Sequence, residues 1–239
     1  MYKKLLLLAL VLVSLTAVSQ EEEVAEVKPM FSQEITKNIK RYVKNSKLAY
    51  HDKDYVRADF LYDSLVQNVI LKSYLDNFKV RKRSGKEIEL NDFKKPMILL
   101  STASWCTPGS GTIPALNDIA HSYGDNIDFV VLYWDTKENA RKASRDFKKN
   151  IHVVYVDELE NKGAAVVKEM KHSLGLPTCF LLDENKKIID IKRTVIHPYN
   201  TDYEVSYEDN YDSFFASVQK LRPTVTIQTS LEVIGTEKN

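Results

Sequence analysis

Hydrophobic residues recur every three or four positions from residue 31 to about residue 78, which is the spacing of one face of an α-helix. Ile35 and Ile39 belong to a first apolar face, and Leu61 and Leu65 belong to a second. A polar run at residues 51–54 separates the two stretches and predicts a short turn. The N-terminal part of the chain is therefore expected to form a helical hairpin.

Residues 49–66 are similar to a single tetratricopeptide unit. No second copy of the pattern follows, and stacked repeats need about three units for stability. We therefore expect the helical hairpin to pack on the domain that follows it rather than to begin an array of repeats. The residues expected to pack between its two helices are Ala49, Tyr55, Ala58 and Tyr62.

The hydrophobic pattern changes after residue 78, from helical spacing to short alternating or continuous apolar runs. Residues 78–90 alternate on both sides of Gly85 and predict a small β-hairpin. Continuous apolar runs then alternate with amphipathic segments, which predicts an α/β fold with a central mixed sheet and helices on both faces. The later elements are expected as strands at 96–101, 127–134, 151–156, 176–182 and 188–191, and as helices at 105–123, 137–148, 163–172 and 211–221.

The N-terminus has the pattern of a targeting signal. Residues 1–19 contain two lysines, a short apolar run, and then the small residues Ala17 and Ser19 before a cleavage point, which is the order of a secretory signal peptide. The apolar run is short for a membrane span, so an uncleaved anchor, the only membrane contact expected, is the weaker alternative. Cleavage predicts a protein secreted across the inner membrane to the periplasm.

The C-terminus is expected to be less ordered than the central domain. Pro223 should end the last helix, because proline cannot continue helical hydrogen bonding. The residues beyond it are polar and alternate weakly, so a tail and an edge strand both remain open. The expected organisation is a signal peptide at 1–19, an acidic leader and helical hairpin at 20–77, an α/β domain at 78–222 and a polar C-terminal tail at 223–239.

Composition excludes several classes of function. The 239 residues include 34 Lys+Arg and 33 Asp+Glu, so the chain has no overall basic field for nucleic acid. Two cysteines are too few for a disulfide scaffold or a four-thiolate zinc site. The five histidines lie in separate predicted elements without the spacing of metal ligands. We therefore expect neither a metal nor another cofactor.

The main candidate for chemistry is the motif Trp105-Cys106-Thr107-Pro108, which follows the predicted buried strand at 96–101. The motif is expected to begin a helix, where unpaired backbone N–H groups and the helix dipole stabilise a negative charge. A cysteine in that position loses its proton more readily, and the thiolate is the nucleophile in disulfide exchange. Cys106 is therefore the predicted catalytic residue.

Two groups of residues match one known pattern: Trp105, Cys106, Pro108, Pro114 and Leu116 in the motif, and Gly175, Leu176, Pro177 and Thr178 before a later strand. Through them the chain resembles the thioredoxin superfamily, and more closely its exported TlpA/ResA-like branch, over residues 78–222. The resemblance implies a thioredoxin-like fold in which a cis-proline, here Pro177, faces the active-site sulfur. It also implies a substrate groove for protein thiols, disulfides or extended peptides, formed by Trp105, Pro108, Leu176, Pro177 and Thr178.

Four positions depart from patterns of this superfamily and bear on the activity. Gly109 stands where the family has its resolving cysteine, so a Cys-x-x-Cys disulfide cannot form. Thr112 replaces the family's glutamate and Leu100 replaces the buried aspartate of thioredoxins, the acids that relay the proton during thiol–disulfide exchange. Ala103 stands where peroxiredoxins place a threonine, which argues against a peroxidase. A two-cysteine cycle is therefore not expected from this degenerate active site.

Two main functions remain open after these departures, and a redox sensor with a reversible Cys106–Cys179 disulfide is a third, weaker one. The first is a single-cysteine thiol–disulfide oxidoreductase that attacks partner disulfides through Cys106 and holds the partner as a mixed disulfide. Release of the partner from this mixed disulfide needs a second thiol, either an external one or that of Cys179. Strand alternation places Cys179 on the same face as Pro177. Cys179 is interpreted more simply as a buried core residue. The second function is a redox-inactive thioredoxin-fold module that binds peptides or proteins.

Overall fold

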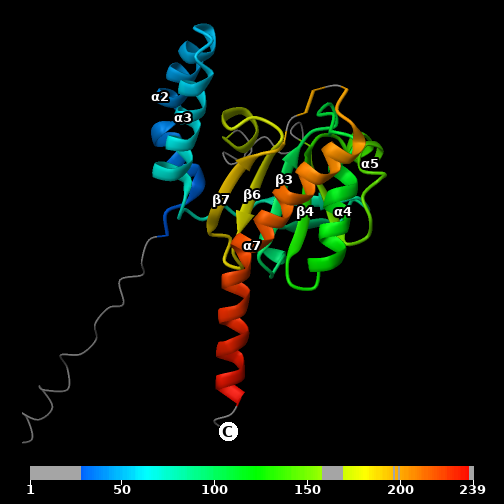
Figure 1. The fold of residues 1–239 in the computed structure, drawn as a ribbon. Coiled ribbons are helices and arrows are strands. Elements are labelled where there is room, and N and C mark those ends of the chain that lie inside the picture. Colours follow the sequence, from blue (N-terminus) through cyan, green and yellow to red (C-terminus); the bar gives the residue numbers. More distant parts are fainter. Residues whose placement is uncertain (1–27, 158–168, 196, 199, 237–239) are drawn as a thin grey trace, which may run out of the picture.

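The computed structural model describes residues 28–157, 169–195, 197–198 and 200–236 (Figure 1). The predicted signal peptide at 1–19 and most of the predicted acidic leader lie outside these residues. Of the helix expected at 163–172, only the π-helical turn η3 (Glu169–Ser173) is described. Within the described ranges, no helix is both long enough and apolar enough to cross a membrane.

The central sheet has seven strands in the described part of the chain: β1 (Lys79–Lys82), β2 (Glu87–Glu89), β3 (Met97–Thr102), β4 (Asp128–Trp134), β5 (Ile151–Val156), β6 (Thr178–Leu182) and β7 (Ile188–Arg193). They lie in the order β2-β1-β5-β4-β3-β6-β7, with β3, β4 and β5 parallel and the other neighbours antiparallel. Every residue of β3 and β4 is buried, which explains their continuous apolar runs. The mixed sheet and the β1–β2 hairpin around Gly85 are confirmed.

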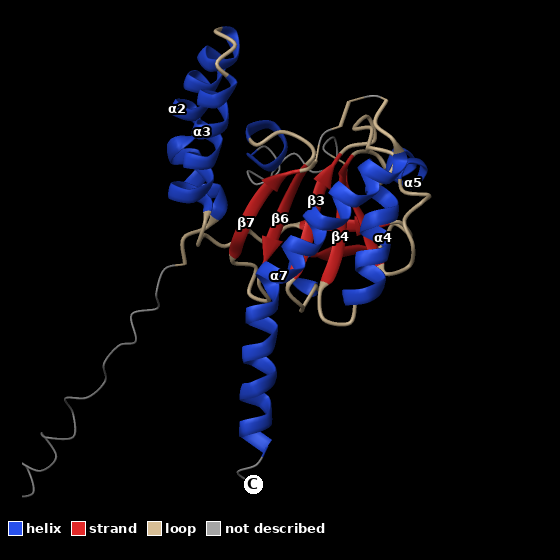
Figure 2. Ribbon diagram, in the orientation of Figure 1, coloured by secondary structure: helices blue, strands red, loops and turns tan. Residues whose placement is uncertain are grey.

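Helices cover both faces of the sheet (Figure 2). One face carries α4 (Thr112–Tyr123), α5 (Lys137–Ala143) and the first half of α7 (Tyr203–Thr236). The opposite face carries α2 (Phe31–His51), α3 (Tyr55–Leu65) and the π-helical turn η1 (Val66–Ile70). The apolar residues of each group form one buried cluster with the sheet face that they cover. The predicted α/β class with helices on both faces is therefore confirmed.

The helical hairpin shares a core with the sheet. The ring of Phe31, at the start of α2, meets the ring of Phe180 in β6 edge to face, with centroids 6.0 Å apart. The backbone N–H and the hydroxyl of Ser32 both donate hydrogen bonds to the Asp76 carboxylate, which fixes the start of α2 on the following segment. The expectation that the hairpin packs on the next domain is therefore confirmed.

Two details of the hairpin differ from the prediction. Helical structure ends at Ile70 rather than near residue 78, because the next residues bond to distant segments: the N–H of Tyr74 donates to the carbonyl of Pro29, and that of Leu75 to Lys186. Of the four residues expected to pack between the helices, Ala49, Ala58 and Tyr62 are buried, whereas Tyr55 is 60% exposed. Tyr55 is the first residue of α3 and lies next to the turn, where its ring meets that of Tyr50 in α2 edge to face and otherwise faces solvent.

Helix α7 is longer at both ends than predicted. It begins at Tyr203 rather than at residue 211, because four aromatic residues at helical spacing stack along it with ring centroids 5.8–6.4 Å apart: Tyr203, Tyr207, Tyr211 and Phe215. It also continues past Pro223 to Thr236. Proline removes one helical hydrogen bond without always ending the helix, so residues 223–236 are helical rather than an edge strand or an irregular tail.

Helix α5 is shorter than the predicted segment 137–148 and ends at Ala143. The residues after it bond to α4 instead of continuing the helix. The amide of Asn117 donates to the carbonyl of Asp146 at 2.9 Å, and its side-chain oxygen accepts a hydrogen bond from the N–H of Lys148 at 2.8 Å. One buried asparagine of α4 therefore holds a turn where the sequence pattern indicates a helix.

Candidate functional site

Cys106 lies in an irregular loop between β3 and α4, and α4 begins only at Thr112. The prediction that the motif itself begins a helix is therefore wrong. A helix N-terminus therefore does not stabilise the Cys106 thiolate, because that effect is confined to the first turn of a helix. The loop is instead closed locally, where the N–H of Cys106 donates to the carbonyl of Ala103 at 3.0 Å.

The N-terminal end of α7 explains why α4 begins late. The hydroxyl oxygen of Ser206, a residue of α7, accepts a hydrogen bond from the N–H of Gly111 at 3.1 Å. A Cβ atom on Gly111 would lie 2.1 Å from the backbone nitrogen of Tyr207, and one on Gly109 would lie 2.8 Å from the Ser206 hydroxyl oxygen. The two glycines therefore permit α7 to pack directly against the backbone of the Cys106 loop.

The residues around Cys106 face solvent. Trp105 is 68% exposed, an unusual position for so large an apolar side chain. Cys106 is partly exposed and free, and Pro108 is exposed. A partner molecule can therefore approach this loop without any rearrangement of the fold.

Asp135, directly after β4, anchors the loop from the neighbouring strand. Its carboxylate accepts hydrogen bonds from the N–H and the hydroxyl of Ser104, at 3.1 and 2.5 Å, and from the amide of Asn139 at 2.7 Å. Burial alone raises the pKa of Asp135, but these hydrogen bonds and those of the backbone outweigh it and hold the pKa below its ordinary value. One feature of the sequence indicates this role: Asp135 is an acidic residue directly after the apolar run of β4, which is parallel to β3.

Asp135→Asn is expected to lower the free energy of unfolding at pH 7 by about 1–2 kcal/mol, because a neutral amide accepts the Ser104 hydrogen bonds less well. A carboxylate with a lowered pKa stabilises the fold above its unfolded pKa, and this contribution is lost as the pH falls through the folded pKa. The difference between the variant and the wild type should therefore shrink towards pH 3. Urea unfolding at both pH values measures it. Asp125→Asn, the same change at an exposed residue, is the control, and an equal loss there would contradict the anchoring role.

The loop before β6 reaches the same edge of the sheet as Cys106. Residues Ser101 of β3 and Thr178 of β6 are paired, so Pro177 and Thr102 follow at the end where β3 leads into the Cys106 loop. The Leu176–Pro177 peptide bond is cis, as the sequence analysis expects. Thr178 is completely buried and its hydroxyl donates to the carbonyl of Gly175 at 2.8 Å, so its side chain holds this turn and does not face a groove. Leu176 and Pro177 are partly exposed.

Cys179 is completely buried, opposite Leu100 of β3, in the apolar cluster beneath α4 and α7. It is free, and burial raises the pKa of its thiol from 9.0 to about 11. This environment is that of a core residue, the interpretation that the sequence analysis favours for it. As a second thiol, Cys179 would have to leave the core.

We expect one reactive thiol per folded chain. Ellman's reagent should titrate Cys106 at once and Cys179 only after unfolding in guanidinium chloride, because the thiol of Cys179 has no access to solvent. The raised pKa of Cys179 adds a second readout. Above pH 9 this thiol ionises in the unfolded chain but not in the folded chain. The stability that the buried thiol contributes is therefore lost as the pH rises from 9 to about 11. Wild type and Cys179→Ala should therefore converge in unfolding free energy across that range. Two fast thiols would contradict the sequestered position of Cys179.

Tyr133, near the carboxyl end of β4, is a neighbour of the site that the sequence analysis did not identify. Burial raises the pKa of its phenol to about 12, and negative charge on Cys106 and Asp135 adds to the shift. Its hydroxyl donates to the carbonyl of Ala143 at 3.3 Å, so it joins the Cys106 side of the sheet to the end of α5. Within the described ranges, no cluster of three or more His, Cys, Asp or Glu side chains is arranged to hold a metal ion.

Comparison with known proteins places this arrangement in a family. A family model for the AhpC/TSA family matches residues 72–191, which is half of the chain. The chain belongs to the AhpC/TSA family. The match includes the Cys106 loop and the Pro177 turn, but neither the helical hairpin nor α7, which contacts Gly111.

Two curated relatives give this AhpC/TSA member its branch. The thioredoxin-like protein YneN of Bacillus subtilis (strain 168) is 27% identical over 116 residues, covering 48% of this chain and 66% of YneN. The thiol-disulfide oxidoreductase ResA of Bacillus thuringiensis subsp. konkukian is 31% identical over 115 residues, covering 47% of this chain and 64% of ResA. The chain therefore spans just under two thirds of each relative's length. It is a thioredoxin-superfamily protein of the ResA-like branch, as predicted.

Solved structures include more distant neighbours of this family member. One is the solution structure of a putative protein disulfide isomerase from Bacteroides thetaiotaomicron, with a TM-score of 0.48 and 19% identity, covering 65% of this chain and 90% of that one. Another is the thioredoxin domain of the thiol-disulfide oxidoreductase BVU-2223 from Bacteroides vulgatus, with a TM-score of 0.47 and 19% identity, covering 61% of this chain and 96% of that domain.

Proposed function

We propose that this protein is an exported, single-cysteine thiol–disulfide oxidoreductase that acts through Cys106. The observation that carries the proposal is the position of Cys106: partly exposed, beside the exposed Trp105, on the loop that leaves β3 at the edge where Pro177 precedes β6. The relative named as a thiol-disulfide oxidoreductase supports the same chemistry. The alanine at position 103 argues against peroxide reduction as the alternative within the family.

The chemistry of one cysteine follows from thiol–disulfide exchange. The Cys106 thiolate attacks one sulfur of a partner disulfide, forms a mixed disulfide, and releases the other partner sulfur as a thiolate that takes up a proton. Gly109 offers no resolving thiol and Cys179 is buried, so an external thiol must attack the mixed disulfide. When that thiol attacks the partner sulfur, Cys106 leaves as a thiolate and the partner is joined to the external thiol. A second external thiol then releases the partner by forming a disulfide with the first. Overall, the partner disulfide gains two electrons, and two external thiol groups supply them by forming a new disulfide.

The exposed residues on both sides of Cys106 are proposed to hold an extended segment of the partner. Trp105 and Pro108 lie on the Cys106 loop, and Leu176 and Pro177 lie on the loop that precedes β6. All four are at least partly exposed, so each has surface that a peptide can cover. The partners are thus protein thiols and disulfides, and the order of residues 1–19 supports secretion across the inner membrane to the periplasm. N-terminal sequencing of the protein from an envelope fraction tests export, and a chain that retains its first residues in the cytoplasm contradicts it.

A redox-inactive module that binds peptides is the second candidate. It is favoured by the loss of the acids at Thr112 and Leu100 and by the irregular backbone around Cys106, which lacks the helix start that would stabilise a thiolate. Such a module would use the same exposed surface without exchanging electrons.

Trapping of a mixed disulfide distinguishes the two candidates. The reduced protein is mixed with an oxidised peptide disulfide, and the intact mass is measured before and after a dithiol is added. The proposal requires the added mass of one peptide thiol, which the dithiol removes. Protein whose accessible thiol has first been alkylated under native conditions is the control and should gain no mass. Binding of the peptide without any covalent adduct would favour the redox-inactive module.

A further inference from the structure

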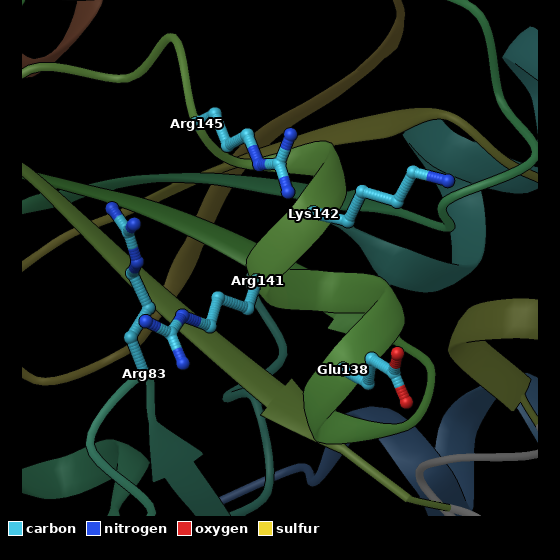
Figure 3. Close-up of a pocket in the computed structure, with 5 residues that line it drawn as sticks. All are labelled: Arg83, Glu138, Arg141, Lys142 and Arg145. Carbon is cyan, nitrogen blue, oxygen red and sulfur yellow. The ribbon is translucent and has the colours of Figure 1, made fainter.

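A basic pocket lies on the opposite side of α5 from the core. It has a volume of about 420 Å³ and is lined by Arg83, Glu138, Arg141, Lys142 and Arg145 (Figure 3). Four of these five residues are cationic, and none is apolar. The whole chain has nearly equal numbers of acidic and basic residues, so this excess of positive charge is a local property.

The cations come from two separate parts of the chain that are held together. Arg83 belongs to the turn between β1 and β2, and the others belong to α5 and the residues directly after it. The ammonium group of Lys137, the first residue of α5, donates to the carbonyl of Ser84 at 3.3 Å and joins the two parts. The basic pocket is therefore built by tertiary structure and not by one run of basic residues.

The guanidinium groups have no counter-charge of their own in the described part of the chain. In Figure 3 the side chain of Arg141 extends toward that of Arg83, whereas the carboxylate of Glu138 points away from both. Arg83, Arg141 and Arg145 are exposed, and none makes an ion pair or a side-chain hydrogen bond with another described residue. Four cationic residues around one pocket repel each other, and a bound anion would relieve the repulsion.

The lining of the pocket indicates the class of ligand. Without an aromatic or apolar side chain, the pocket offers no surface on which a hydrophobic ligand can pack. Several arginines spread around an open pocket suit a ligand with several anionic groups, and the planar guanidinium matches a carboxylate with two parallel hydrogen bonds. An acidic peptide segment has both properties.

α5 links the basic pocket to the Cys106 loop. Asp135 precedes α5 in the chain, and its carboxylate binds the backbone and hydroxyl of Ser104 in the Cys106 loop. β3 and β4 are parallel, so the Cys106 loop and α5 both begin at the carboxyl edge of the sheet, whereas β1 is antiparallel to β5 and leads Arg83 toward the opposite edge. We propose that the basic pocket binds an acidic segment of the protein partner whose disulfide reacts at Cys106. This inference rests on the proposed oxidoreductase function for the identity of the partner, but not for the binding itself.

Binding is tested without redox chemistry, in the Cys106→Ser protein. A fluorescein-labelled peptide rich in Asp and Glu and free of cysteine is titrated with protein, and fluorescence anisotropy is followed at low and high salt. The triple variant Arg83→Gln/Arg141→Gln/Arg145→Gln should bind about tenfold more weakly, since each exposed charge pair contributes modestly. The matched control is Lys40→Gln/Arg41→Gln/Lys44→Gln, which removes the same charge from the exposed side of α2 and should bind as the parent does.

Three results would overturn the inference: no binding of the acidic peptide, an equal loss in the α2 control, or equal binding of a peptide in which Asn and Gln replace the acids. If the peptide does not bind but calorimetry detects binding of inorganic phosphate, the pocket is assigned to a small anion instead. A second assay uses protein that retains Cys106. It follows the reduction of disulfide peptides in which acidic or neutral residues flank the cysteines. The triple variant should raise KM for the acidic peptide alone and leave kcat unchanged. If the acidic peptide binds but no disulfide is reduced, the proposed function fails and the binding site stands.

Discussion

Gly111→Ala is expected to lower the free energy of unfolding by about 3 kcal/mol or more, an unusually large effect for the addition of one methyl group. The added Cβ atom would lie 2.1 Å from the backbone nitrogen of Tyr207 and 2.4 Å from its Cα atom, so no side-chain rotation can relieve the clash. Either α7 must move away from the loop or the loop must leave α4. The hydrogen bond from Gly111 to Ser206 is lost in both cases.

Two neighbouring substitutions make the Gly111 experiment specific. Gly109→Ala meets the hydroxyl oxygen of Ser206 at 2.8 Å, a side-chain atom that can rotate at the expense of its hydrogen bond, so about 1–2 kcal/mol is expected. Ser110→Ala lies between them, is exposed, and should change stability by less than about 0.5 kcal/mol. Urea unfolding of the three variants measures this order. A Gly111→Ala protein as stable as Ser110→Ala would show that α7 does not pack on the loop.

The sequence predicted those parts of the fold that are determined locally or by burial. β3 and β4 are buried on both faces and are read directly as continuous apolar runs. Gly85 has a positive φ of 95°, and the turn it makes was recognised from the alternation around it. Cys106 and Pro177 lie at one sheet edge because of the order and direction of the strands. The resemblance of the Cys106 motif to the thioredoxin superfamily implied that arrangement.

The start of α4 was not predictable in the same way. The hydrogen bond between Gly111 and Ser206 joins residues 95 positions apart, and no local pattern contains such a contact. Gly109 and Gly111 were visible in the sequence as unfavourable residues for a helix, but the reason for them lies in the approach of α7. The consequence reaches the chemistry, because the argument for a thiolate stabilised by a helix start depended on this one boundary.

Cys106→Ser is expected to abolish disulfide reduction, with a loss of about a hundredfold or more in rate, because a serine hydroxyl is not a nucleophile toward disulfides at neutral pH. Reduction of insulin disulfides in the presence of a dithiol measures the effect relative to the uncatalysed rate. Cys179→Ala is the matched control: it removes the other sulfur from the core, costs about 1–2 kcal/mol of stability through a small cavity, and should leave the rate per folded molecule unchanged. A Cys106→Ser protein that reduces insulin as fast as the wild type would contradict the proposed function.

The dependence on external thiol separates a one-cysteine cycle from one that uses Cys179. With glycine at position 109 and the Cys179 thiol buried, release of the mixed disulfide should be first order in added thiol over the whole accessible range. An intramolecular release by Cys179 would instead give a rate that does not depend on external thiol, and Cys179→Ala would abolish that release. Stopped-flow measurement of the freed peptide therefore reports whether the core opens during the cycle. The fold predicts that it stays closed, since Cys179 lies in β6 next to β3 and belongs to the apolar cluster that the sheet forms with α4 and α7.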